Sequence, residues 1–191
     1  MTILPLMMLC LLLGAAVWHD VHARRIPNAV VFPGMLAAFV LHTALPAGPG
    51  LFGTPMGGLG LLSSLGGFGV GLAILLPMYA LRLMGAGDVK LLAMVGAFVG
   101  AGQIITVGLV TLVAGGVLAL AFAAWQGNLR RLVANAYHMA LHTTFSALAG
   151  AVAAPTVPPK AASGRLPYAI AIAVATIFCV LWLRVHGELP L

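Results

Sequence analysis

The amino-acid sequence predicts an all-α membrane protein, a polytopic bundle of about six transmembrane helices. Of its 191 residues, 62% are hydrophobic and only 6% are charged, whereas an average soluble domain carries roughly 25% charged residues. So few polar side chains cannot cover the surface of a soluble fold, and the apolar residues gather in long runs. The nine Lys and Arg residues are spread along the chain and form no basic patch. We therefore expect no nucleic-acid partner.

The first three apolar runs are separated by two connections. A polar segment divides the first run, residues 3–18, from the second, residues 30–45. A Gly/Pro-rich, uncharged loop at residues 46–58 leads to the third run, residues 59–81. A helix needs roughly 20 apolar residues to cross the hydrocarbon core of a bilayer. The first run is therefore near the lower limit, whereas the third is long enough.

The last three runs differ in length. Residues 89–99 are too few to cross without their flanks, which is acceptable where polar backbone lies inside the bundle. The fifth run, residues 104–125, is long enough, and the sixth, residues 168–183, is again near the lower limit. Glycine is dense in the third to fifth runs, where small residues let helix backbones approach closely in lipid. We expect one membrane-embedded domain over residues 1–191.

The positions of the basic residues predict the orientation of the bundle. Eight of the nine lie in or beside the connections that follow the first, third and fifth runs, and only Arg184 lies on the other side. Because cytoplasmic loops carry the excess of Lys and Arg, these connections are expected in the cytoplasm. The last of them is a cytoplasmic or interfacial segment at residues 126–165, in which residues 128–150 carry apolar side chains near helical spacing. This favours a helix on the inner membrane surface, with a loosely ordered linker as the alternative.

Only three carboxylates, Asp20, Asp88 and Glu188, are present to carry acid–base chemistry. The predicted topology places Asp20 and Asp88 at one membrane face and at similar depth. Ionisable groups in membrane helices are costly and mark functional sites. Two neighbouring carboxyl groups titrate apart, so that one activates water while the other protonates a carbonyl oxygen. The alternative is that Asp20 is a polar residue near Arg24 and that Asp88 only caps a helix.

The residues around both aspartates form a recognisable pattern. Residues 85–91 read GAGDVKL, which contains the GxGD motif of membrane aspartic proteases, and Asp20 is followed by IPN at residues 26–28. Residues 166–172 read LPYAIAI. In this order the three segments resemble the type IV prepilin peptidase family. The last is similar to the start of the final helix in its short members, the TadV/CpaA-like peptidases of Flp-type pili.

The resemblance implies an aspartic endopeptidase that cleaves the leader of a type IV prepilin at the cytoplasmic face of a bacterial inner membrane. Asp20 and Asp88 would be the catalytic pair, with membrane lipid around them and with no cofactor or metal. For Lys90, three roles stay open: steadying an aspartate, contacting lipid headgroups or anchoring the membrane interface. The other residues that match motif or supporting positions are Gly85, Gly87, Pro27 and Asn28.

Larger members of that family carry an additional N-methyltransferase region with paired CxxC motifs. The two cysteines of this chain, Cys10 and Cys179, lie far apart inside apolar runs. They form no CxxC pair and read as small buried hydrophobic residues. Methylation is therefore not expected.

Two further interpretations stay open. In the first, the chain is a small transporter or a pilus-assembly membrane protein that uses Asp20 and Asp88 as a proton or cation site. A relay across the bilayer normally needs more ionisable residues at intermediate depth, which argues against this. In the second, His19 and His22 join Asp20 in a metal site, and His138 and His142 form another metal-binding pair. Polar residues at the membrane interface are the simpler explanation of these histidines.

Overall fold

The computed structural model describes residues 3–53, 55–81, 84–127, 134 and 167–187. These residues form six helices and no β-strand beyond one isolated bridge between Ala47 and Gly58, which confirms the prediction of an all-α bundle. Among them, four helices are long and apolar enough to cross a membrane: α1 (Leu4–Ala23), α3 (Leu61–Ala80), α5 (Ala101–Trp125) and α7 (Tyr168–His186). The other two are shorter: α2 (Asn28–Ala44) and α4 (Ala86–Val99).

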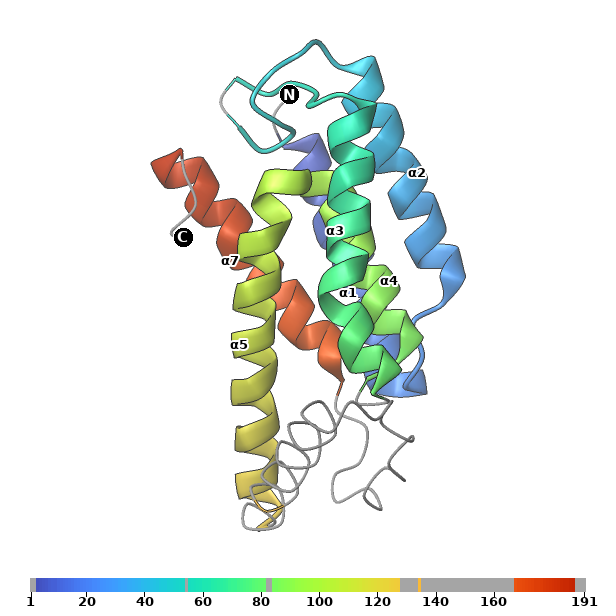
Figure 1. Ribbon diagram of the computed structural model, residues 1–191, viewed down its shortest axis with the longest axis vertical. Helices are drawn as coiled ribbons and strands as arrows, with labels where there is room; N and C mark the ends of the chain where they lie inside the picture. Colours follow the sequence, from blue (N-terminus) through green and yellow to red (C-terminus); the bar gives the residue numbers. More distant parts are fainter. Residues whose placement is uncertain (1–2, 54, 82–83, 128–133, 135–166, 188–191) are drawn as a thin grey trace, which may run out of the picture. The chain divides into compact units, whose positions relative to one another are not determined.

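The chain divides into two compact units, one comprising residues 1–115 and 167–191 and the other residues 116–166. Apart from residues 126, 127 and 134, the predicted surface segment at 126–165 lies outside the described residues. In the first unit, α1 and α3 end where α2, α4 and α7 begin, which is the lower end of that unit in Figure 1. We call this the aspartate end, because it contains Asp20 and Asp88.

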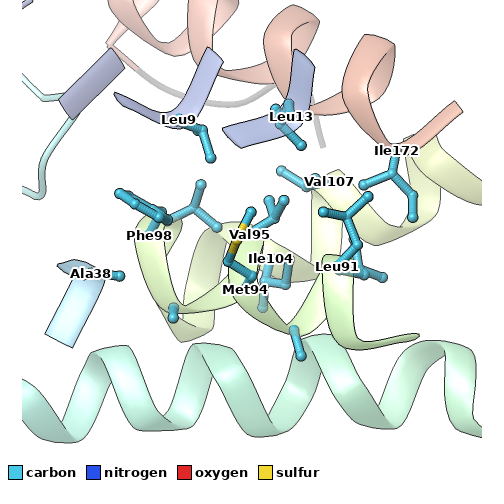
Figure 2. Packing of buried hydrophobic residues seen from close by; sticks show 14 of the residues in the cluster. Leu9, Leu13, Ala38, Leu91, Met94, Val95, Phe98, Ile104, Val107 and Ile172 are labelled. Atoms are coloured by element: carbon cyan, nitrogen blue, oxygen red, sulfur yellow. The ribbon is translucent and has the colours of Figure 1, made fainter. Parts of the chain in front are cut away.

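Helix α4 lies at the centre of the first unit. Its residues from Leu91 to Val99 are all buried, and the helix contacts α1, α2, α3 and α7. Figure 2 shows side chains of α4 among labelled side chains from α1, α2, α5 and α7. A helix of 14 residues is shorter than the roughly 20 needed to cross a bilayer. Because neighbouring helices surround residues 91–99, this part of α4 is covered by protein rather than exposed to lipid.

Glycine lets α3 and α4 pack backbone against backbone, as the glycine-rich runs predict. A Cβ atom on Gly67 would contact the carbonyl oxygen of Gly96, and a Cβ on Gly96 would contact that of Gly67. One turn further along α3, a Cβ on Gly71 would lie 2.7 Å from the carbonyl oxygen of Leu92. In lipid such close approach replaces the hydrophobic effect as a source of helix association.

The far end of α4 is held by two buried polar side chains, Ser64 and His42, that belong to neither of the sequence motifs. Ser64 Oγ donates a hydrogen bond to the carbonyl oxygen of Ala97 at 2.7 Å. His42 Nδ1 accepts the Leu59 N–H at 3.1 Å, so His42 Nε2 carries the proton and donates it to the carbonyl oxygen of Phe98 at 3.0 Å. The last carbonyl groups of a helix lack intrahelical partners. These two bonds provide partners for the carbonyl oxygens of Ala97 and Phe98.

The helices extend beyond the apolar runs, and this changes where both aspartates lie. The runs predict a first helix that stops at residue 18 and a fourth that starts at residue 89. In the structure α1 continues to Ala23 and α4 begins at Ala86. Backbone hydrogen bonding continues through polar residues, because it does not depend on side-chain hydrophobicity. Asp20 is therefore in the last turns of α1, and Asp88 is in the first turn of α4.

Candidate functional site

Asp20 is buried at the end of α1, where it caps a different helix. Its side chain is 8% exposed, and Oδ2 accepts a 3.2 Å hydrogen bond from the backbone N–H of Ala169, the second residue of α7. The first N–H groups of a helix have no intrahelical partner and carry partial positive charge. Pro167, which precedes α7, provides no side-chain cap. Asp20 supplies one from α1.

The chain leaves α1 through a left-handed residue. Arg24 has φ of 53°, and its backbone N–H donates to the carbonyl oxygen of Asp20 at 3.0 Å. Residues other than glycine rarely adopt this conformation, although it is a common way to end a helix. Arg24 also lies close enough to interact electrostatically with the Asp20 carboxylate. The turn directs residues 25–28 toward the start of α4.

Asp88 is the third residue of α4, and Gly85 is the residue that caps this helix. Asp88 Oδ2 accepts the Gly85 N–H at 3.2 Å, and the Asp88 N–H donates to the Gly85 carbonyl oxygen at 3.2 Å. This reciprocal pair fixes the first turn of α4. Asp88 therefore does cap α4, as the alternative interpretation expected, but from the third helical position, while Gly85 occupies the N-cap position.

The two carboxyl groups interact with each other. Burial and, second, the charge of Asp20 raise the pKa of Asp88 from 3.8 to about 6, against the opposing hydrogen bond from the Gly85 N–H. A nearby like charge disfavours the ionised form of a carboxyl group. The structure thus brings together at the aspartate end the two carboxylates that the sequence singles out, one from α1 and one from α4.

Tyr168, the first residue of α7, is a third polar group beside this pair. Its hydroxyl donates to the carbonyl oxygen of Thr111 at 3.3 Å, and its ring packs over Gly115. The Asp88 carboxylate is close enough to interact with it electrostatically. In the sequence, Tyr168 stands out only as part of the LPYAIAI segment. Its position directly after Pro167, at the start of a helix, was the one signal that pointed to it.

The supporting residues of the two motifs meet. A Cβ added at Gly87 would lie 3.2 Å from Cβ of Ile26. Lys90 Nζ donates to Asn28 Oδ1 at 3.2 Å. Pro27, between Ile26 and Asn28, is the residue that precedes α2. Two segments about 60 residues apart in the chain therefore form one structural unit next to Asp88.

The histidines near Asp20 do not converge on it. Both His19 and His22 are exposed, whereas Asp20 is buried. His22 Nδ1 pairs with the carbonyl oxygen of Trp18 at 2.9 Å, and the two rings stack with centroids 4.0 Å apart. Within the part of the chain that the structure describes, no three His, Cys, Asp or Glu side chains are arranged to hold a metal ion. The pair His138 and His142 lies outside the described residues.

Comparison with known families decides the classification. The model of the type IV leader peptidase family matches residues 7–120, a range that contains both aspartates and both motif segments. The chain belongs to the type IV leader peptidase family. No curated protein and no solved structure matches it. The family identifies this multi-pass membrane protein as a protease in general terms and confirms the resemblance to prepilin peptidases, while the likeness to the short TadV/CpaA-like members stays a prediction.

Proposed function

We propose that this leader peptidase is an aspartic endopeptidase that removes the leader of a type IV prepilin of the Flp type, with Asp20 and Asp88 as its catalytic pair. The observation that carries the proposal is their arrangement. The two carboxyl groups come from different helices to one end of the unit, and burial together with the charge of Asp20 raises the pKa of Asp88. Paired carboxyl groups of this kind are the catalytic groups of aspartic proteases.

The chemistry follows from the proton that the pair retains. With its pKa raised to about 6, Asp88 is the group suited to hold that proton and donate it to the carbonyl oxygen of the scissile bond. Asp20 accepts a proton from water as the water oxygen attacks the carbonyl carbon. When the tetrahedral intermediate collapses, the C–N bond breaks, Asp20 gives the proton that it took from water to the amide nitrogen, and Asp88 recovers a proton from a hydroxyl of the intermediate. The products are the leader with a free carboxylate and the mature pilin with a free amine.

The position of the site suits this substrate. A prepilin joins a polar leader to a hydrophobic helix, so its cleavage point lies near a membrane surface. Asp20 and Asp88 lie at the ends of their helices, not at mid-span. The excess of basic residues in the connections at this end favours the cytoplasmic face of a bacterial inner membrane.

The test is cleavage of a candidate prepilin by the purified protein in lipid, with the masses of the products determined. Asp20→Asn and Asp88→Asn should each abolish cleavage, because an amide keeps the size and hydrogen bonds of the carboxyl but cannot exchange its proton. The double variant should be hardly worse than either single one, since the groups act together. Normal processing by either single variant would refute the assignment.

Two controls accompany this test. Glu188→Gln should cleave normally, because Glu188 is predicted to lie at the opposite membrane face. A metal chelator should leave the rate unchanged, whereas a loss of activity would favour the histidine–metal interpretation. If the wild-type protein leaves every prepilin intact but carries protons into liposomes in a manner that requires Asp20 and Asp88, the transporter interpretation replaces the peptidase.

A further inference from the structure

The role of Lys90 follows from the direction in which its side chain leaves α4. Residues two apart on an α-helix point about 200° apart, so Lys90 leaves α4 on nearly the opposite side from Asp88. Its ammonium group donates to Asn28 Oδ1 at 3.2 Å and lies 5.6 Å from the centre of the Phe32 ring. Asn28 and Phe32 are four residues apart on α2 and so share one face of it. Lys90 therefore joins α4 to the start of α2.

This geometry argues against the three roles for Lys90 that the sequence left open. The charge that raises the pKa of Asp88 is that of Asp20, and Lys90 is not among the groups that shift it. The ammonium group is directed to a protein acceptor and an aromatic ring on α2. A contact of that kind orders a segment of chain. It requires neither a lipid headgroup nor an aspartate.

The segment that Lys90 holds is the short connection between Asp20 and α2. This connection touches α4 at two points, Ile26 against Gly87 and Asn28 against Lys90. The first point is next to Asp88 in the chain. Anything that shifts Ile26 and Asn28 therefore moves the end of α1, which carries Asp20, relative to the start of α4, which carries Asp88.

We propose that Lys90 is a positioning residue that, by binding Asn28, keeps Asp20 and Asp88 at the separation needed for peptide hydrolysis. This inference rests on the proposed peptidase function. Lys90 itself touches neither the substrate nor the reacting atoms. Its effect passes through Asn28 and the connection between α1 and α2.

The experiment measures prepilin cleavage by variants of both partners. Lys90→Met keeps the length of the side chain but removes the donor, and it should lower kcat about tenfold with little change in KM. That loss is smaller than the roughly 10²-fold cost that a 1 Å misplacement can reach. Asn28→Leu should cause the same loss, and the double variant should be no worse than either, because they remove one interaction. Lys90→Arg retains a donor and should restore most of the activity.

A second measurement distinguishes positioning from a general loss of stability. If Asp20 moves away from Asp88, the pKa of Asp88 falls toward its ordinary value, and the alkaline limb of kcat/KM shifts to lower pH. Destabilisation alone lowers the melting temperature without moving that limb. Arg25→Met is the matched control, since it removes a positive charge at the same end without touching Asn28. It should leave both the rate and the pH profile unchanged.

The inference is overturned if Lys90→Met cleaves at the wild-type rate, or if Arg25→Met loses as much activity as Lys90→Met. If Lys90→Met does not fold, Asn28→Leu decides alone, and wild-type kinetics in that variant overturn the inference. Failure of the peptidase proposal looks different. If the peptidase proposal fails, Asp20→Asn and Asp88→Asn still cleave the prepilin. If only the inference about Lys90 fails, both of these variants are inactive, whereas the variants of Lys90 and Asn28 cleave at the wild-type rate.

Discussion

Replacement of Gly71 by alanine tests the packing that places α4, and with it Asp88, in the bundle. The added Cβ would lie 2.7 Å from the carbonyl oxygen of Leu92 and 3.2 Å from Cα of Ala93. Both are backbone atoms, which cannot rotate away as the end of a side chain can. Helices α3 and α4 must therefore move apart by several tenths of an ångström.

A nearby glycine of α3 provides the reference for the magnitude. Overpacking of a well-packed interior costs about 1–3 kcal/mol, whereas alanine is favoured over glycine inside a helix by roughly 0.5–1 kcal/mol. At Gly69, which is exposed and where an added Cβ meets nothing within 4 Å, only the second effect acts. Gly69→Ala should thus be slightly stabilising, and Gly71→Ala should be less stable than it by the packing cost, about 1–3 kcal/mol.

The assay is unfolding of the purified variants in mixed micelles, followed by circular dichroism as the fraction of denaturing detergent is raised. The same preparations are then tested for prepilin cleavage, where Gly71→Ala should be the slower enzyme because α4 carries Asp88. If Gly71→Ala proves as stable as Gly69→Ala, then α3 and α4 do not pack backbone against backbone, and the reasoning fails.

Three further predictions concern acid–base chemistry, buried polar groups and topology. Cleavage, measured as kcat/KM, should fall as pH rises through about 6, because Asp88 loses the proton that it donates; a rate that rises through this range would contradict its role as the acid. Ser64→Ala should lower the free energy of unfolding by about 0.5–1.5 kcal/mol, because it removes the buried hydrogen bond that Ser64 donates to the carbonyl oxygen of Ala97. Unchanged stability in the detergent assay would count against that bond. Single cysteines in the loop at residues 46–58 should react with an impermeant thiol reagent added outside the cell, whereas those near residue 130 should not; the reverse pattern would put the aspartates on the wrong side for leader cleavage.

Much of this protein could be predicted from its sequence, because the relevant signals are local. Low charge and long apolar runs predict a helical membrane bundle. In lipid the backbone N–H and C=O groups must form hydrogen bonds within the protein, and a helix provides them within one segment. The motif at residues 85–91 and the earlier Asp20 indicate the family, which the match over residues 7–120 confirms. The dense glycines of α3 and α4 correctly predict close packing of backbones.

The contacts that build the candidate site were decided by the tertiary structure. Asp20 caps α7 across 149 residues of sequence, and Lys90 binds Asn28 across 62. Nothing local to these residues indicates such partners, because the partner depends on which faces of which helices meet. His42 is a further example, since a histidine in an apolar run acquires a role only when α4 ends beside it. Hydrophobicity and helix formation are properties of a short stretch of chain, whereas the pairing of buried polar groups is a property of the packed bundle, in which each such group must find a partner.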